Sequence, residues 1–348
     1  MPVNAEAKVF EQKILESGQS RFQDFLFGRH VLGGVAVEVH TNDPELLDEI
    51  ATTFGPPSDR PAQTRLGATI VAHADSAVIR FEADDPSTLT PGDMVMALES
   101  PGFPFRLIEP EWPGWTAFAF RDDETALFHF RDEHVIVRRR EHWRAGIGFL
   151  LLHRIYRMRS DAIFFHAATV GIFGRGVMLV GAKGAGKSTT ALALTARGRT
   201  LLGDEIACYV PRTGELVPFL RPVGIKPGIR SPKIHDALVG AGLEPGDNIV
   251  RVDIRRFLEV PEPHPVPLAA IVFLEPFEAE PRLEPAQASM ADIGRLQPSA
   301  GSLVNAPAAL RTMQMAKMLS SAKIFRLSPA EPDETAALLE SAIGDLTR

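Results

Sequence analysis

The residues best suited to chemistry in this sequence form one glycine-rich stretch near its middle. Residues 181–188 read Gly-Ala-Lys-Gly-Ala-Gly-Lys-Ser and match the phosphate-binding pattern G-x-x-x-x-G-K-[ST] at every fixed position. Glycines allow left-handed backbone angles, so that neighbouring N–H groups can close around phosphate oxygens. Lys187 would reach the β- and γ-phosphates, and the hydroxyl of Ser188 would bind Mg²⁺. The stretch therefore predicts a nucleoside triphosphate site, for ATP with Mg²⁺. The residues expected to bind the nucleotide here are Gly181, Ala182, Lys183, Gly184, Ala185, Gly186, Lys187, Ser188 and Thr189.

Two adjacent acids follow this stretch at a spacing that suits metal binding and proton transfer. Asp204 and Glu205 come 17 and 18 residues after Lys187, beyond a helix-stop glycine and a short apolar run. A helix and a returning strand would bring both carboxylates beside the phosphates, where phosphoryl transfer needs Mg²⁺ and a group that orients or deprotonates the acceptor. The alternative is a structural pair of surface acids. Glu275, which ends the apolar strand predicted at 268–274, is a second candidate for the metal site.

One histidine lies in the apolar run that leads toward the glycine-rich stretch. Residues 163–172 read as a strand that carries His166, and residues 173–176 turn it back into the strand before the loop. A histidine on an apolar strand is more often a core residue, but this hairpin also puts the ring where it could lie over the transferred phosphate. A hairpin in this place differs from the lead-in of an ordinary doubly wound sheet.

The elements next to the glycine-rich stretch are those that a phosphate-binding loop requires. Residues 176–180 form a short apolar run typical of a buried strand, and residues 189–196 read as a helix that Gly198 ends. The unpaired N–H groups at the start of this helix and the positive end of its dipole favour the same anion. Strands are also predicted at 206–210 and 268–274.

Two domains are predicted from the length and patterning of the chain. Residues 1–140 are expected to form an α+β domain of antiparallel strands, without a motif that points to a chemistry. Residues 141–348 are expected to form the nucleotide-binding domain, with the amphipathic stretch 141–159 as a linking helix. Within the first domain, helices are predicted at 1–28, from Asp43-Pro44 to about Thr53, and at 91–99.

Composition restricts the class of protein. Of the 348 residues, 45% are hydrophobic and 23% charged, as in an ordinary globular protein. The 37 basic and 44 acidic residues give a net charge of −7, which argues against a general nucleic-acid binder.

No apolar run approaches the roughly 20 residues that cross a bilayer, and the polar N-terminus lacks the apolar core of a signal peptide. The single cysteine, Cys208, excludes an internal disulfide, and its apolar surroundings favour a buried thiol. We expect a cytoplasmic protein with neither nucleic acid nor membrane as a partner.

Together these motifs resemble the C-terminal catalytic domain of HPr kinase/phosphorylase and, more closely, the HPr-kinase-related proteins. The resemblance is carried by residues 165–168, the hairpin, residues 177–188, Gly198 and residues 201–205, and it is specific over 160–226. It implies an α/β class (α+β overall), with a C-terminal P-loop domain built on a mixed sheet. ATP-dependent phosphoenolpyruvate carboxykinase shares that fold, in which a hairpin before the loop is expected.

The resemblance also implies roles for single residues. Asp204 would be the general base toward the acceptor hydroxyl with His166 in support, and Glu205 would share the Mg²⁺ with the loop serine. Arg221 and Lys226 match basic positions that would contact phosphates or substrate. The stretch that the family ties to phosphorolysis has no counterpart here, so the resemblance does not imply that reverse reaction. The expected catalytic residues are Asp204, His166 and Lys187, and the expected metal ligands are Ser188, Glu205 and Asp204.

We therefore expect an ATP-dependent, Mg²⁺-requiring kinase that transfers the γ-phosphoryl group to a hydroxyl, namely a serine of a protein or peptide. Two alternatives stay open. A small-molecule kinase also places an acid at this distance after the loop lysine, although its loop follows a simple parallel strand. A nucleotide-binding module without catalysis would use ATP as a switch. The sequence identifies neither the acceptor nor the oligomeric state, and a homo-oligomer is compatible with it.

Overall fold

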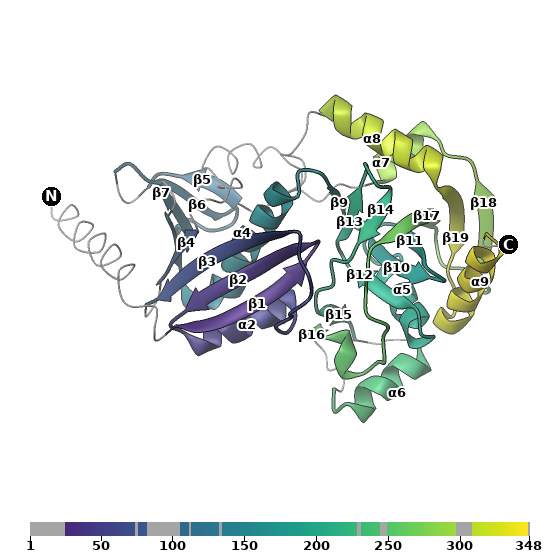
Figure 1. Cartoon of the computed structure of the whole chain (residues 1–348), viewed down its shortest axis with the longest axis horizontal. Coiled ribbons are helices and arrows are strands. Elements are labelled where there is room, and N and C mark those ends of the chain that lie inside the picture. Colours follow the sequence, from purple (N-terminus) through teal and green to yellow (C-terminus); the bar gives the residue numbers. More distant parts are fainter. Residues whose placement is uncertain are drawn as a thin grey trace. The chain divides into compact units, whose positions relative to one another are not determined.

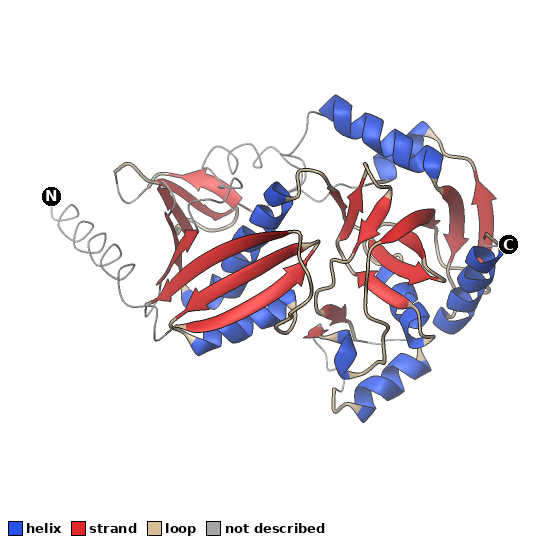
Figure 2. Ribbon diagram, viewed as in Figure 1, coloured by secondary structure: helices blue, strands red, loops and turns tan. Residues whose placement is uncertain are grey.

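The chain divides into two compact units of mixed α and β structure. The structure, a computed structural model, describes residues 25–73, 76–81, 105–110, 113–131, 134–227, 231–243, 249–296 and 308–346. The first unit ends at Met158 and the second begins at Arg159, and the turn Leu32–Gly34 is counted with the second. Both units combine helices and strands (Figures 1 and 2), which confirms the expected α/β class in its broad form. The division of the chain at residue 140 stays a prediction.

The first unit contains β1 (Leu26–Leu32), β2 (Val35–Thr41), α2 (Pro44–Phe54), β3 (Thr64–Ala72), β4 (Ser76–Phe81), β5 (Phe105–Ile108), β6 (Thr116–Phe120), β7 (Phe128–Arg131), β8 (His134–Arg138), the 3₁₀ turn η2 (Arg140–His142) and α4 (Trp143–Met158).

An eight-stranded sheet forms the centre of the first unit. Its order among the described residues is β1-β2-β3-β4-β8-β7-β6-β5. The pairs from β3 to β5 are antiparallel, whereas β2 and β3 pair in parallel. The expectation of antiparallel strands is therefore wrong for this pair. The physical reason is the connection, because α2 carries the chain back across the sheet between the two strands, as a parallel pair requires.

Helices α2 and α4 pack against each other and against the sheet of the first unit. Asp43 caps α2, since its Oδ1 accepts hydrogen bonds from the N–H groups of Glu45 (2.9 Å) and Leu46 (3.2 Å). Helix α4 begins two residues later than the stretch predicted as a helix and ends one residue earlier. The helix predicted at 91–99 lies outside the described residues, as does that at 1–28 except for its last residues, which belong to β1.

The second unit contains β9 (Ile163–Phe165), β10 (Ala168–Ile172), β11 (Arg175–Val180), α5 (Lys187–Ala196), β12 (Thr200–Gly203), β13 (Ala207–Val210), β14 (Glu215–Val217), β15 (Val223–Ile225), α6 (Pro232–Gly240), β16 (Val250–Val252), η3 (Ile254–Arg256), β17 (Val266–Leu274), β18 (Arg282–Ala286), α7 (Met290–Arg295), α8 (Ala308–Ser321), β19 (Lys323–Ser328) and α9 (Pro332–Asp345).

A mixed sheet organises the second unit, and β17 is its branch point. β17 pairs in parallel with β11 on one side and with β19 on the other, and its first residues pair antiparallel with β14. From β11 the sheet continues through β10 to β12, and from β14 it continues through β13 to β9. β10 and β11 form the predicted antiparallel hairpin, closed by a turn at Phe173 and Gly174. The expected mixed sheet is present.

Helices cover both faces of this sheet, so its central strands are apolar on both sides. In β11, Val177 and Leu179 face the core beneath α5 and α9, whereas Met178 and Val180 face the core beneath α7 and α8. This explains the continuous apolar run that predicted the strand, since a strand buried on both faces shows no alternation. None of the helices in the described ranges has the length and apolar character of a bilayer-spanning segment.

The run predicted as one strand at 163–172 is two strands in different halves of the sheet, and this prediction is wrong. β9 pairs with β13, and β10 pairs with β12. His166 lies in the bend between β9 and β10, where it is exposed, rather than on a strand. Every residue of both strands is buried, so the apolar residues on the two sides of His166 look like one continuous buried strand.

Candidate functional site

The glycine-rich loop connects the carboxyl end of β11 to the amino end of α5. Gly184 and Gly186 have φ angles of 87° and 95°, in the left-handed region that other residues rarely adopt. A Cβ at Gly184 would meet no atom of the described residues within 4 Å, so the loop is open there. The first N–H groups of a helix have no partner within it, and those of α5 follow the loop directly. The loop therefore has the backbone geometry of an anion cradle.

Lys187 holds its ammonium group over this loop. Its Nζ donates hydrogen bonds to the carbonyl oxygens of Gly181 (2.7 Å) and Ala182 (3.1 Å). Burial lowers the pKa of Lys187, and the charge of Lys226 lowers it further, against the opposing effect of Asp204 and Glu205. The cation thus lies among charged neighbours at the start of α5, where an anionic ligand would stabilise it.

A short hydrogen bond joins the loop helix to the first predicted acid. Ser188 Oγ donates to Asp204 Oδ1 at 2.8 Å. Asp204 is only 7% exposed, and burial raises the pKa of its carboxyl group, although the bond from Ser188 acts in the opposite direction. Two residues that are 16 positions apart in the sequence are therefore in direct contact. A hydroxyl and a carboxylate together are hard oxygen ligands of the kind that Mg²⁺ takes.

The bend at Asp204 is fixed by backbone crowding. The pairing of β10 with β12 shifts register after Thr169, which lies opposite Gly203. A Cβ at Gly203 would lie 2.6 Å from the carbonyl oxygen of Ile206 and 3.2 Å from that of Phe219, so a larger residue does not fit. Glu205 has a φ of 66°, a left-handed angle that is strained for a residue with a Cβ. Register shifts and strained residues of this kind gather at functional sites.

Two chain segments cross together from one half of the sheet to the other at this bend. Phe165 lies opposite Ala207 and Thr169 lies opposite Gly203, and three residues lie between these two pairs on each segment. This brings the His166 bend beside the Asp204–Glu205 bend. No hydrogen bond joins His166 to Asp204 or Ser188 in the described structure, so its role stays a prediction.

Glu205 points toward a basic residue that the sequence did not single out. Arg251 Nη2 lies 3.6 Å from Glu205 Oε2, and both side chains are partly exposed. Arg251 lies on β16, opposite Gly224 of β15, and Lys226 follows β15 directly. The Val-Arg-Val alternation at 250–252 is typical of a short strand, but no local signal indicates which strand it pairs with.

The other predicted residues differ in how closely the structure brings them to the loop. Lys183 is exposed on the loop itself, and Thr189 is half-buried in the first turn of α5. Lys226 is exposed and close enough to affect the pKa of Lys187. Arg221 is half-buried just before β15. Within the described ranges, no group of three or more His, Cys, Asp or Glu residues could hold a metal ion.

Glu275, the rival acid, is held by an ion pair of its own. Its Oε1 accepts a hydrogen bond from Arg295 Nη1 at 2.7 Å, and Arg295 also donates to the carbonyl oxygen of Leu274 at 3.2 Å. Two residues further on, Phe277 reaches the loop, since a Cβ at Gly186 would lie 3.2 Å from its Cζ. The sequence analysis did not identify Phe277.

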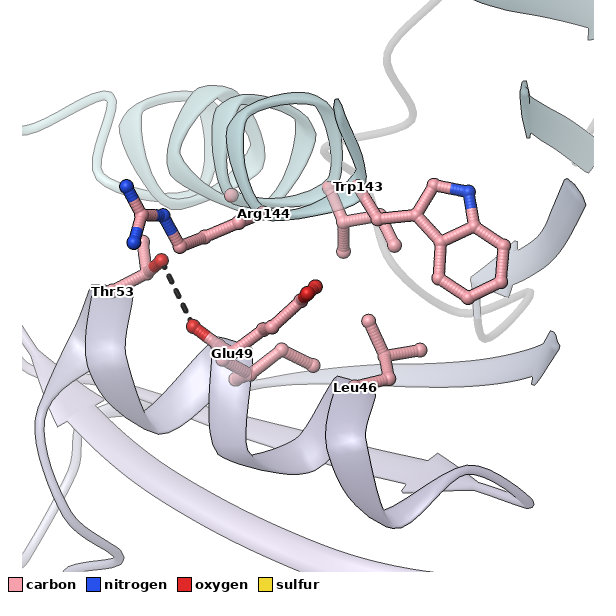
Figure 3. Close-up of a pocket in the computed structure, with 8 residues that line it drawn as sticks. Leu46, Glu49, Thr53, Trp143 and Arg144 are labelled. Atoms are coloured by element: carbon pink, nitrogen blue, oxygen red, sulfur yellow. Dashed lines mark hydrogen bonds between the residues drawn. The ribbon is translucent and has the colours of Figure 1, made fainter. Parts of the chain in front are cut away.

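The first unit has a small pocket between α2 and α4, shown in Figure 3. Glu49 projects from α2 into it, and burial raises the pKa of that carboxyl group against the effect of Arg140 and Arg144. A Cβ at Gly148 would lie 3.0 Å from Cγ2 of Thr53, which shows how closely the two helices approach. We assign the pocket to helix packing. Its lining residues are Leu46, Glu49, Ile50, Thr53, Trp143, Arg144, Ile147 and Gly148.

Comparison with known proteins relates part of the chain to one family. No family model matches it. A segment of 53 residues is 47% identical to an HPr kinase/phosphorylase of Prosthecochloris aestuarii (strain DSM 271 / SK 413), covering 15% of each protein. The solved HPr(Ser) kinase/phosphatase from Coxiella burnetii aligns over 53% of this chain and 95% of that structure, with 14% identity and a TM-score of 0.25. The similarity to HPr kinase/phosphorylase inferred from the motifs is thus confirmed for a segment, and the chain spans 15% of the length of the curated relative it matches.

Proposed function

We propose that this chain is an ATP-dependent, Mg²⁺-requiring kinase that transfers the γ-phosphoryl group to a hydroxyl acceptor. The main support is the 2.8 Å hydrogen bond from Ser188 Oγ to Asp204 Oδ1, because it puts a buried carboxylate next to the last residue of the loop motif. Phosphoryl transfer needs a cradle for the phosphates and a group that orients or deprotonates the acceptor. The second unit is proposed to be a P-loop domain of the HPr kinase and phosphoenolpyruvate carboxykinase type.

The glycine-rich loop would hold the phosphates of ATP. The N–H groups at the start of α5 would donate to phosphate oxygens, and Lys187 would turn from the carbonyl groups of Gly181 and Ala182 to the β- and γ-phosphates. That exchange replaces two neutral partners with an anion. It would therefore favour the charged form of a lysine whose pKa is lowered by burial.

Asp204 is the proposed general base, with Ser188 and Glu205 as the Mg²⁺ ligands beside it. The pKa of Asp204 is raised by burial, and a carboxylate with a raised pKa is a stronger base toward an acceptor hydroxyl. Bound Mg²⁺ would neutralise phosphate charge. Glu205 would exchange the partly exposed Arg251 for the metal, which costs little because exposed ion pairs are weak. His166 is assigned a supporting role from the facing bend.

The proposed acceptor is a serine of a protein or peptide. Its support is the sequence similarity of a 53-residue segment to a protein named HPr kinase/phosphorylase. Basic residues near the acids, Arg251 and Lys226, would suit an acceptor that carries negative charge.

Transfer of γ-labelled phosphate tests the proposal. The purified full-length chain is incubated with labelled ATP and Mg²⁺, alone and with a cell lysate freed of nucleotides. Label on a polypeptide, lost in Lys187→Ala and Asp204→Asn but kept in the surface control Asp236→Asn, would support a protein kinase. Label in a small soluble compound would favour a small-molecule kinase. ATP binding without transfer to any acceptor would contradict catalysis and favour a nucleotide switch.

A further inference from the structure

An exposed aromatic ring lies at the same edge of the sheet as the glycine-rich loop. β11 and β17 are parallel neighbours in the sheet (Figure 1). Val180 lies opposite Phe273 in this pairing. Their carboxyl ends therefore meet at one edge, which is where open α/β sheets bind ligands. The loop follows β11, and Phe277 comes three residues after the end of β17.

The ring of Phe277 approaches the loop at its last glycine. A Cβ at Gly186 would lie 3.2 Å from Cζ and 3.7 Å from Cε1 of Phe277, so the ring presents an edge to the loop backbone. Phe277 is nevertheless 53% exposed, whereas most phenylalanines of this unit are buried. A ring that touches the loop with its edge and stays open elsewhere has a face available for a planar ligand.

The backbone on both sides of Phe277 is fixed. The N–H group of Glu275 donates to the carbonyl oxygen of Leu327 at 2.8 Å, and that of Glu278 donates to Pro329 at 3.1 Å. The Glu275–Arg295 ion pair and the restricted φ of Pro276 fix the approach further. The backbone that carries the ring is therefore held in place before any ligand arrives, and this lowers the entropy lost on binding.

We infer that Phe277 is the platform on which the base of the bound nucleoside triphosphate stacks. This inference rests on the proposed function, since the phosphates must lie in the adjoining loop. Stacking of a base on an aromatic ring uses the π-face that every base has, so Phe277 would add affinity for the nucleoside without choosing strongly among bases. Purines offer the larger face and are the expected class.

Two probes separate the base from the phosphates. ATP and inorganic tripolyphosphate are titrated by calorimetry into the full-length chain with Mg²⁺. We expect Phe277→Ala to weaken ATP binding roughly 10- to 100-fold and to leave tripolyphosphate binding unchanged, while Phe277→Trp keeps ATP affinity. The matched control is Phe173→Ala, because Phe173 is 52% exposed in the turn at the opposite end of β11. It should change neither affinity.

The outcomes distinguish this inference from the proposed function. Equal ATP affinity in Phe277→Ala and Phe173→Ala, with tripolyphosphate still bound, would overturn the platform alone. An equal loss of affinity for ATP and for tripolyphosphate in Phe277→Ala would also overturn it, because the ring would then support the loop rather than the base. A wild-type chain that binds neither probe would overturn the phosphate site and the platform together.

Discussion

Ser188 Oγ donates a 2.8 Å hydrogen bond to Asp204 Oδ1, and this bond connects the two sequence motifs of the chain. Ser188 lies in the first turn of α5, and Asp204 follows directly after β12. Because α5 leads back to β12 on the same sheet, the helix and the returning strand bring together residues that are 16 positions apart. The bond holds a buried carboxylate beside the loop, and the first prediction below concerns that carboxylate.

Asp204→Asn should strongly reduce transfer and stabilise the fold. Removing a general base costs roughly 10²- to 10⁴-fold in turnover, whereas ATP affinity should persist because the loop is intact. The pKa of Asp204 is raised in the folded chain, so the ionised carboxylate opposes folding at neutral pH and ceases to do so as the pH falls through that raised pKa. The variant should therefore melt at a higher temperature at pH 7, with a smaller gain near pH 4.

Calorimetry and labelled-phosphate assays on the same preparations check this prediction. The exposed residue Asp236 provides the control, since Asp236→Asn should change stability by no more than about 0.5 kcal/mol. If Asp204→Asn kept the turnover of the wild type, Asp204 could not be the general base.

Gly203→Ala should disrupt the bend that carries Asp204. Its Cβ would meet two backbone carbonyl oxygens, of Ile206 at 2.6 Å and of Phe219 at 3.2 Å, and backbone atoms cannot move aside as a flexible side chain does. We expect a loss of about 2 kcal/mol or more in unfolding free energy and a fall in turnover. Gly171→Ala in the adjacent β10 would meet only atoms of Thr200, none closer than 3.5 Å, which is ordinary van der Waals contact, and should cost less than about 1 kcal/mol. Urea unfolding of both variants measures these changes. Equal losses of unfolding free energy in Gly203→Ala and Gly171→Ala would show that crowding does not fix the bend.

Glu340→Gln should loosen the attachment of the loop helix. Glu340 is buried on α9 and accepts hydrogen bonds from Arg197 (2.8 Å) and Arg199 (2.6 Å), which flank the turn from α5 to β12. The arginines are partly exposed, so we expect a loss of about 1–3 kcal/mol rather than the full cost of a broken buried pair. The exposed Glu334 on the same helix is the control. Chemical denaturation that gives the same midpoint for Glu340→Gln and Glu334→Gln would contradict the prediction.

The first unit should lose stability in mild acid because of His129. Burial, with a smaller contribution from Arg138, lowers the pKa of His129 to about 4. The ring stays neutral in the folded state while the unfolded chain takes up a proton near pH 6.5, so stability is full above pH 6.5 and falls toward pH 4. The loss could reach about 3 kcal/mol. Burial also lowers the pKa of His30, in the same direction.

Tryptophan fluorescence can follow this unit separately, because all three tryptophans, at 112, 115 and 143, belong to it. We expect His129→Leu to flatten the dependence of the unfolding free energy on pH, and His235→Leu, at an exposed position of the second unit, to leave it unchanged. A curve for His129→Leu as steep as that of the wild type would count against the assignment.

Local sequence patterns predicted the parts of the site that depend on neighbouring residues. The loop, its flanking strand and helix, and the hairpin before them each have a short-range signature, and the structure has all of them. The return of Asp204 to the loop could be predicted because one helix and one strand lie between them. The pattern failed at 163–172, since two buried strands in series look the same as one.

Partners that come from distant segments could not be predicted. Arg251 reaches Glu205 only because β16 pairs with β15, and no local signal encodes that pairing. Phe277 reaches Gly186 because β17 lies next to β11, a consequence of sheet order. In the first unit, the parallel pairing of β2 and β3 likewise depends on the route that α2 takes.

The two crossing segments at the bend have matched lengths. From Phe165 to Thr169 and from Ala207 back to Gly203 the chain takes the same four residue steps, so the Thr169–Gly203 pair continues the register of the β9–β13 pairing, and the shift within the β10–β12 pairing comes only after Thr169. An insertion of one residue in either segment alone would slip one pair and reverse the faces of its side chains. A simultaneous insertion in both would preserve the pairing. The lengths of the two segments that carry His166 and Asp204 are therefore coupled, because a change of length in one segment needs an equal change in the other if both strand pairings are to keep their register.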